Sequence, residues 1–137
     1  MPAIGAAKLH SMSEVASPEP GNTDWARPMV HWEIVARDAD AQAAFYRELF
    51  NWEVGDGRIR TIPPGLGGPE PGPAGHIRPG REPSIALYVQ VRDLRSSLDN
   101  AVRLGATITA EPFDVPGGPT LAGITDPEGN RLVLVQQ

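Results

Sequence analysis

Residues 30–38, VHWEIVARD, and residues 85–93, IALYVQVRD, begin two copies of one pattern. In each copy a strand-like run ends in Arg-Asp and leads into a helical pattern. The two aspartates, Asp38 and Asp93, are 55 residues apart, and the same offset relates the residues around them. A repeat of this kind predicts two half-domains that pair with each other.

The two copies differ where a ligand would lie. The offset places His31 on Ala86 and Glu33 on Tyr88, so the first copy carries an imidazole and a carboxylate that the second lacks. Alternation of apolar and polar residues over 29–35 predicts a strand. One face of this strand would carry His31, Glu33 and Val35.

A helix is expected after the first strand. Asp38 or Asp40 can cap its N-terminus. Its expected apolar stripe consists of Ala41, Ala44, Phe45 and Leu49. Two short strands, 51–54 and 58–62, should follow, joined by a turn at 55–57.

Proline and glycine dominate the region between the two copies. They account for 13 of the 21 residues from Pro63 to Pro83, which argues against a long strand there. The small apolar segment 74–77, which contains His76, could form a short edge strand.

The second copy is more regular. Residues 84–91 alternate as a strand, Asp93 can cap a helix, and Gly105 can end it. The apolar face of that helix would carry Leu94, Leu98, Ala101 and Val102. Three further strands are expected at 107–113, 120–125 and 131–135. Each half then reads β-α-β-β-β, which is an α+β fold.

Composition narrows the class of protein. The chain has 137 residues, 40% of them apolar, which suits one domain with a hydrophobic core. A net charge of −5 and the lack of a basic cluster argue against a nucleic-acid partner. The chain has no cysteine and no apolar run long enough to span a membrane, so we expect a cytoplasmic protein without membrane partners. Residues 1–27 have the composition of a disordered arm.

Several motifs resemble the vicinal oxygen chelate superfamily, the group of glyoxalases, bleomycin-resistance proteins and extradiol dioxygenases. They are the run HWEI before Asp38, the helical FY followed by LFNW, and the closing turn DPEGN at 126–130. The resemblance implies a single domain at 28–137. Its two paired βαβββ modules, residues 29–80 and 83–137, would form an incomplete, cup-shaped mixed barrel.

The resemblance also bears on metal binding. His31 matches the first metal ligand of the family's enzymes, whereas two further ligand positions fall on Ala86 and Val133, which have no donor atoms. His76 is the one plausible donor for the remaining position. A divalent ion needs three or more protein ligands, so no metal cofactor is expected. If one bound, its ligands would be His31, Glu33 and His76.

Strand parity, together with the family's inward-facing His31, predicts the residues that line the cup. They are His31, Glu33 and Val35 from the first strand, Ala86, Tyr88 and Gln90 from its counterpart, and Arg131, Val133 and Val135 from the last strand, with His76 in addition. Such a lining is typical of a small-molecule site. His31 and Glu33 could serve as general base and acid near neutral pH, because a nearby carboxylate raises the pKa of an imidazole and partial burial can raise the pKa of a carboxyl group. Alternatively, His31 only hydrogen-bonds to Glu33 or Tyr88 and takes no part in chemistry.

Three functions remain open at this stage. The first is a metal-independent protein that encloses a hydrophobic or aromatic ligand, such as a metabolite or an antibiotic. The second is a metal-free lyase, isomerase or cyclase that uses His31 and Glu33 for proton transfer. The third is a metal-dependent glyoxalase-like or dioxygenase-like enzyme. The resemblance further implies a homodimer.

Overall fold

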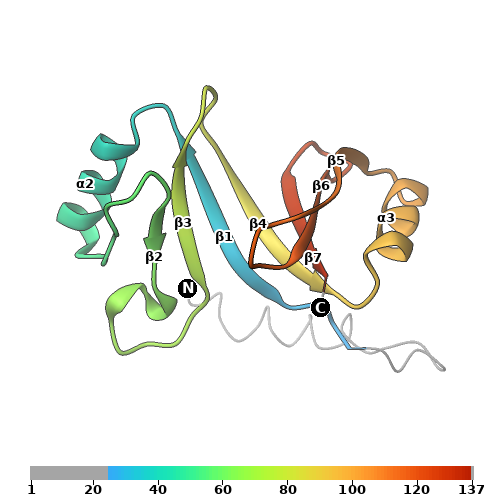
Figure 1. Cartoon of the computed structure of the whole chain (residues 1–137), viewed down its shortest axis with the longest axis horizontal. Helices are drawn as coiled ribbons and strands as arrows, with labels where there is room; N and C mark the ends of the chain where they lie inside the picture. The colour runs from blue at the N-terminus through green and yellow to red at the C-terminus, as the bar shows by residue number, and fades with distance from the viewer. Residues whose placement is uncertain (1–24, 137) are drawn as a thin grey trace, which may run out of the picture.

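The computed structural model describes residues 25–136 as one sheet with helices at its two ends (Figure 1). Seven strands follow the order β2-β3-β1-β4-β7-β6-β5, and the two end strands do not pair with each other. The fold is therefore a mixed α+β fold whose sheet is not closed into a barrel. Its elements are β1 (Met29–Ala36), α2 (Ala39–Phe50), β2 (Arg60–Ile62), a 3-10 turn (Pro64–Gly67), β3 (Ala74–Pro79), β4 (Ser84–Val91), α3 (Leu94–Arg103), β5 (Thr107–Asp114), β6 (Thr120–Thr125) and β7 (Arg131–Gln136).

The first strands of the two copies lie side by side at the centre of the sheet. Strands β1 and β4 are antiparallel, and His31 lies opposite Tyr88. Each of them has a parallel neighbour on its other side, β3 beside β1 and β7 beside β4. Each half of the sheet therefore has a central strand with a parallel neighbour on its outer side, as expected for two copies of one unit.

Both helices begin at the predicted aspartates. The Asp38 carboxylate accepts a hydrogen bond from the backbone N–H of Ala41 at 3.0 Å, and the Asp93 carboxylate accepts one from Ser96 at 3.1 Å. These bonds satisfy backbone donors that the first turn of a helix otherwise leaves without a partner.

The predicted buried face of α2 is wrong. Phe45 and Leu49 are 51% and 60% exposed, whereas Ala39 and Ala43 are buried. The inward side of α2 carries Ala39, Ala43 and Tyr46 instead, and the Tyr46 ring stacks on Trp52 just after the helix, with centroids 4.8 Å apart. Ala39 packs in one apolar cluster with Ile34 and Ala36 of β1, so its small side chain lets the helix lie close to the sheet. Helix α3 buries Leu94 and Leu98 as predicted, but its Val102 is 52% exposed.

The first half has one strand fewer than predicted. Residues 51–58 form no strand. The side chain of Arg47 supplies hydrogen bonds that a neighbouring strand would otherwise make. Its guanidinium donates to the carbonyl oxygens of Val54 at 2.8 Å and Gly55 at 3.1 Å. The expected strand at 51–54 is thus wrong, and the expected strand at 58–62 is reduced to β2.

Strand β3 is an internal strand, which corrects the edge strand expected at 74–77. It pairs with β1 on one side and β2 on the other. Gly75 makes this possible, because a Cβ there would lie 2.2 Å from the Trp32 ring. A glycine that the sequence presents as a strand breaker therefore lets β3 pack against β1.

The expected disordered arm, residues 1–27, lies outside the described residues up to residue 24. Within the described part, the guanidinium groups of Arg27 and Arg92 lie 4.5 and 5.1 Å from the centroid of the Trp25 ring. No helix in residues 25–136 is long and apolar enough to cross a membrane.

Candidate functional site

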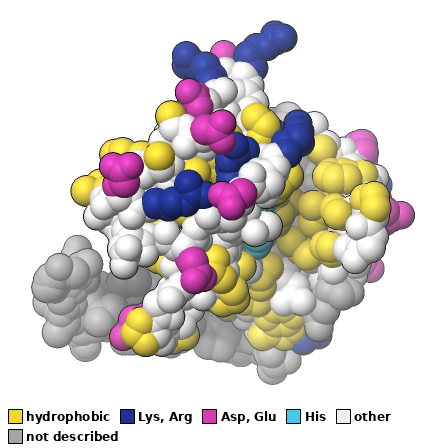
Figure 2. All heavy atoms as spheres, turned by 60° about the vertical axis from the view of Figure 1, so that its left-hand side comes forward, with side chains coloured by type: hydrophobic (Ala, Val, Ile, Leu, Met, Phe, Trp, Pro, Cys, Tyr) yellow, Lys and Arg dark blue, Asp and Glu magenta, His cyan; other side chains and the backbone are white. Residues whose placement is uncertain are grey.

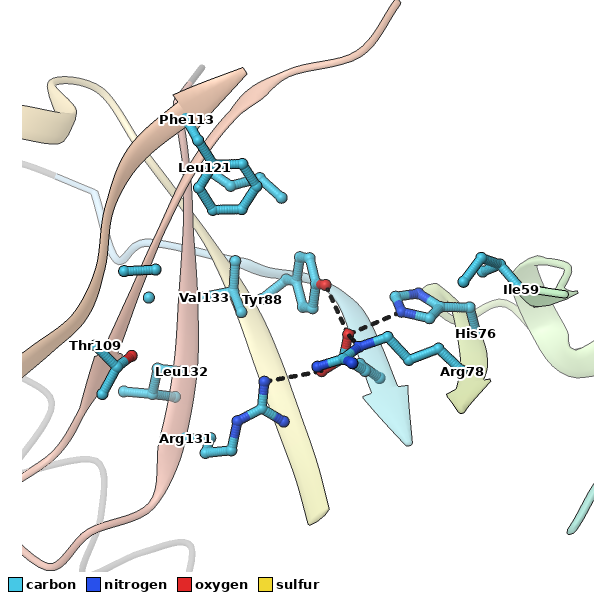
Figure 3. A pocket seen from close by; sticks show the side chains of 13 residues that line it. Ile59, His76, Arg78, Tyr88, Thr109, Phe113, Leu121, Arg131, Leu132 and Val133 are labelled. Carbon is cyan, nitrogen blue, oxygen red and sulfur yellow. Dashed lines mark hydrogen bonds and ion pairs between the residues drawn. The ribbon is translucent and has the colours of Figure 1, made fainter. Parts of the chain in front are cut away.

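A buried carboxylate lies at the centre of the candidate site. Glu33 on β1 is 3% exposed. Its oxygens accept hydrogen bonds from Arg78 Nε at 2.7 Å, Arg131 Nη2 at 2.9 Å, His76 Nε2 at 3.0 Å and the Tyr88 hydroxyl at 3.3 Å. Figure 3 shows these side chains converging on one point. We call these five residues the Glu33 cluster.

The sheet order explains why the Glu33 cluster forms. His76 lies directly beside Glu33 in the β1–β3 register, and Arg78 follows two residues later on the same face of β3. Tyr88 comes from β4 on the other side of β1, and Arg131 comes from β7 beyond it. Three strands, β3, β4 and β7, thus direct polar groups onto one carboxylate on β1.

The environment keeps Glu33 ionised. Burial raises the pKa of a carboxyl group, but here the hydrogen bonds from His76, Arg78 and Arg131 outweigh it and hold the pKa well below its usual range. A carboxyl group that acts as a general acid or base near neutral pH needs a raised pKa. The expectation that Glu33 has a raised pKa is therefore wrong, and its part in proton transfer stays a prediction.

A hydrogen-bonded chain links Glu33 to His31 through His76. His31 Nε2 lies 2.8 Å from His76 Nδ1, while Nε2 of His76 contacts Glu33. Because a carboxylate only accepts, Nε2 of His76 donates to it, and in neutral His76 Nδ1 accepts from His31. Burial, and then the neighbouring His76, lower the pKa of His31 and outweigh the effect of Glu33, which corrects the raised pKa expected from the sequence; the imidazole is neutral at neutral pH.

Tyr88 remains a neutral phenol in this cluster. Burial and the nearby Glu33 charge raise its pKa to about 12. Its ring also packs edge-on against His31, with the centroids 4.9 Å apart. Tyr88 therefore donates to Glu33 and forms part of the wall beside the two histidines.

Two adjoining cavities open beside the Glu33 cluster. The larger has a volume of about 600 Å³ and joins the cluster to apolar residues on β5, β6 and β7. The smaller, of about 420 Å³, contains His31 and shares His76, Tyr88 and Leu121 with the larger. Figure 2 shows a histidine side chain visible from outside among hydrophobic side chains. The larger cavity is lined by Glu33, Ile59, His76, Arg78, Tyr88, Thr109, Ala110, Phe113, Leu121, Gly123, Arg131, Leu132 and Val133.

Most of the residues predicted to line the cup lie around these cavities. Glu33, His76, Tyr88, Arg131 and Val133 line the larger one, and His31 lines the smaller one.

Val35, Ala86 and Gln90 lie elsewhere, and Ala86 is 1% exposed and lines neither cavity. The Val35 side chain is buried beneath Gly80, where an added Cβ would be 2.4 Å from it. Gln90 lines neither cavity; its backbone N–H donates to the carbonyl of Pro28.

Arg78, Phe113 and Leu121 were not predicted from the sequence as site residues. Arg78 is two residues after His76 and shares its face, so extending the expected strand 74–77 by one residue would have included it. Phe113 and Leu121 come from β5 and β6. Their approach to the cluster depends on the curvature of the sheet, which strand parity does not give.

The donor set does not fit a divalent metal ion. His76 lies between His31 and Glu33 and uses one ring nitrogen for each, so the three do not converge on a common point. Ala86 and Val133 provide no donors. Within residues 25–136, no group of three His, Cys, Asp or Glu side chains is placed to hold a metal.

Comparisons with known proteins give a family match and several similar solved structures. A family model described as a glyoxalase-like domain matches residues 29–135. No curated protein matches the chain. Similar solved structures include a hypothetical protein from Bacillus halodurans, with a TM-score of 0.61 and 12% identity over 82% of this chain and 96% of that one.

Two further structures share the fold. A glyoxalase/bleomycin resistance protein/dioxygenase superfamily member from Vibrio splendidus has a TM-score of 0.56 and 12% identity, over 82% of this chain and 100% of that one. Methylmalonyl-CoA epimerase from Mycobacterium tuberculosis has a TM-score of 0.53 and 17% identity, over 79% and 86%. At these identities the likeness concerns the fold alone.

Proposed function

Because the chain belongs to the glyoxalase-like domain family, within the vicinal oxygen chelate superfamily, we propose that it binds a small molecule in the cavity beside Glu33. The ligand has a hydrophobic or aromatic body, and binding needs no metal ion. One fold in this superfamily can serve many functions, so the proposal depends on the site itself.

The proposal rests on one observation: the carboxylate oxygens of Glu33 are already used by hydrogen-bond donors of the protein itself. Four side-chain donors already surround its two oxygens, which makes the carboxylate a poor metal ligand. A ligand in the larger cavity would contact the hydrogen-bond donors of the Glu33 cluster at one end. At the other end it would contact Phe113, Leu121 and Val133, which we call the apolar wall. This combination is typical of small-molecule sites.

Apolar side chains in the lining of the larger cavity are exposed enough to contact a ligand. Phe113 is 48% exposed and Ile59 is 39% exposed, although both line the larger cavity. Covering apolar surface yields about 25 cal/mol for each Å² removed from water. A ligand that covers these side chains would gain affinity without any new hydrogen bond.

A neutral aromatic dye tests the proposal. We expect phenylnaphthylamine to become fluorescent on binding to the protein. Phe113→Ala should weaken this binding about fivefold or more, because it removes apolar contact area worth roughly 1 kcal/mol. Phe45→Ala is the matched control, since Phe45 is equally exposed but lies on α2, and it should bind the dye as the wild type does.

Two results would contradict the proposal. One is dye binding that Phe113→Ala leaves unchanged, since the dye would then bind elsewhere. The other is stoichiometric binding of Zn²⁺ or Mn²⁺ in calorimetry that His31→Ala abolishes, since the site would then be a metal centre.

A second candidate function is metal-free proton transfer, and the hydrogen-bonded chain from Glu33 to His31 supports it. Neutral His31 can accept a proton, and the resulting positive charge would be stabilised through His76 by the Glu33 carboxylate. Glu33 then acts as the fixed charge at the end of the chain. NMR can follow exchange of the acidic C–H of phenylpyruvate for deuterium: catalysed exchange that His31→Gln abolishes would favour an enzyme, and uncatalysed rates would favour a binding protein.

A further inference from the structure

The larger cavity carries a local excess of positive charge. Two guanidinium groups, Arg78 and Arg131, and one carboxylate, Glu33, are the permanent charges in its lining. The net charge of these three groups is +1. The chain as a whole has a net charge of −5, so this cavity has the opposite sign to the protein around it.

The other polar groups around the cavity do not cancel this charge. Tyr88 is a neutral phenol, as its raised pKa requires, and His31 in the adjoining cavity is neutral. No carboxylate other than Glu33 lines either cavity within the described residues. Low-dielectric walls strengthen the field of an uncompensated charge at such a place.

Both guanidinium groups keep hydrogen-bonding capacity for a ligand. Arg78 uses Nε and Nη2 for Glu33, which leaves Nη1 without a partner in the described part of the chain. Arg131 uses Nη1 for Ser84 and Nη2 for Glu33, which leaves Nε. Their side chains are 38% and 33% exposed, so solvent, or a ligand that replaces it, reaches both.

Glu33 holds these two cations in place. The carboxylate lies behind them with 5% of its side chain exposed, and its ion pairs restrict both long side chains. Ordering an arginine normally costs conformational entropy when a ligand binds. Here that ordering is already present in the folded protein.

The cavity also separates its polar and apolar ends. In Figure 3, Phe113 and Leu121 lie on one side of the cavity and Arg131 on the other, with Val133 between them. A ligand that contacts both ends needs an acid group at one end of an apolar body.

We propose that the cavity binds an amphiphilic monoanion, whose carboxylate-type acid group lies on Arg78 and Arg131 and whose apolar or aromatic body lies against Phe113, Leu121 and Val133. This inference rests on the proposed binding function and names its ligand class. One negative charge on the ligand compensates the single positive excess, and guanidinium groups bind such oxyanions through charge-assisted hydrogen bonds.

A matched pair of dyes tests the acid group. Anilinonaphthalene sulfonate and phenylnaphthylamine share one aromatic skeleton, but only the first carries an acid group. We expect the sulfonate to bind about tenfold more tightly than the neutral dye at low salt, as expected for one charge-assisted hydrogen bond. Added salt should reduce this preference.

Four variants test which arginine produces the preference. Arg78→Gln should remove most of the tenfold preference and leave the affinity for neutral phenylnaphthylamine unchanged, while Arg78→Lys should keep much of the preference. Arg131→Gln should act like Arg78→Gln, so the test does not depend on one variant being folded. Arg103→Gln, on α3 outside both cavities, removes the same charge and should leave the preference intact.

The outcomes separate this inference from the proposed function. If both dyes bind equally, or if Arg103→Gln reduces the preference as much as Arg78→Gln does, the acid-group site is wrong while the binding function stands. If neither dye binds to the wild type, the binding function itself fails. A preference that both cavity arginine variants abolish and Arg103→Gln retains supports the inference.

Discussion

At the scale of single residues, Glu33 connects the fold to the site. Its carboxylate joins β1 to side chains from β3, β4 and β7, the most distant of which is 98 residues away in the sequence. A buried charge pair adds little to stability compared with a well-packed apolar pair, but the loss of one partner leaves the others uncompensated. Glu33 should therefore matter more for stability than any of its partners alone.

The first prediction concerns the replacement of this carboxylate. Glu33→Gln keeps the shape of the side chain but leaves the guanidinium groups of Arg78 and Arg131 without a counter-charge. We expect a loss of about 3 kcal/mol in the free energy of unfolding, measured by urea denaturation. Arg103→Gln, which breaks only an exposed hydrogen bond to Asn100, should cost less than about 0.5 kcal/mol. Equal stability of Glu33→Gln and wild type would contradict this role.

The same carboxylate predicts how stability depends on pH. The folded-state pKa of Glu33 lies below its unfolded value of 4.5, so the unfolded chain binds more protons in acid. The contribution of Glu33 is then complete above pH 4.5 and decreases as the pH falls toward the lowered pKa. Wild type should lose stability more steeply than Glu33→Gln below pH 4.5 in the same denaturation assay; parallel curves would show that the pKa is not lowered.

At the scale of secondary-structure elements, β3 shows how a proline- and glycine-rich stretch contributes to the site. It brings His76 and Arg78 beside Glu33, and Gly75 lets it lie close to Trp32. The glycine thus has a packing role, because the ring occupies the space of a side chain. Along β3, the site residues His76 and Arg78 therefore alternate with residues of the opposite face, which include Gly75.

A substitution at Gly75 tests this packing. In Gly75→Ala the added methyl group would overlap the Trp32 ring, so we expect destabilisation of about 2 kcal/mol. The matched control is Gly57→Ala, where the nearest atom to an added Cβ lies at 3.5 Å and the backbone is not in the left-handed region; its effect should stay within about 0.5 kcal/mol. Thermal unfolding of both variants measures the difference, and similar melting temperatures would contradict the close approach.

At the scale of the whole molecule, the helices lie at the two ends of the sheet (Figure 1), and apolar side chains of β4 are exposed. Ile85 is 63% exposed and Leu87 is 43% exposed. Exposed apolar residues that lie together on one face are a common feature of protein interfaces. We therefore retain the expectation of a homodimer, with this face of β4 as its contact.

Sedimentation velocity measures that prediction. The wild type should sediment as a dimer at micromolar concentration, and Ile85→Asp should shift it to a monomer, because a carboxylate buried in an apolar contact is costly. Leu104→Asp is a control at another exposed leucine, 67% exposed and beyond the end of α3, and should remain a dimer. A monomeric wild type would rule out this arrangement.

Much of the fold follows from local features of the sequence. Period-two alternation locates β1, β4, β6 and β7 to within a residue or two, and Asp38 and Asp93 locate the starts of both helices. These features depend on residues a few positions apart, whose hydrogen bonds and packing faces are set by the backbone itself. The 55-residue repeat likewise indicates the pairing of the two halves.

The tertiary structure alone decided which face of α2 is buried, that Arg78 joins the site, and that Glu33 stays ionised. The buried face of α2 depends on how the helix packs against the sheet, and the site depends on contacts of Glu33 with residues 43 to 98 positions away on three other strands. The pKa of Glu33 is the clearest case, since burial alone would raise it and its partners lower it. The sequence by itself determined which strands carry the chemical groups, whereas the ionisation and the cavity arise from contacts that exist only once the sheet has formed.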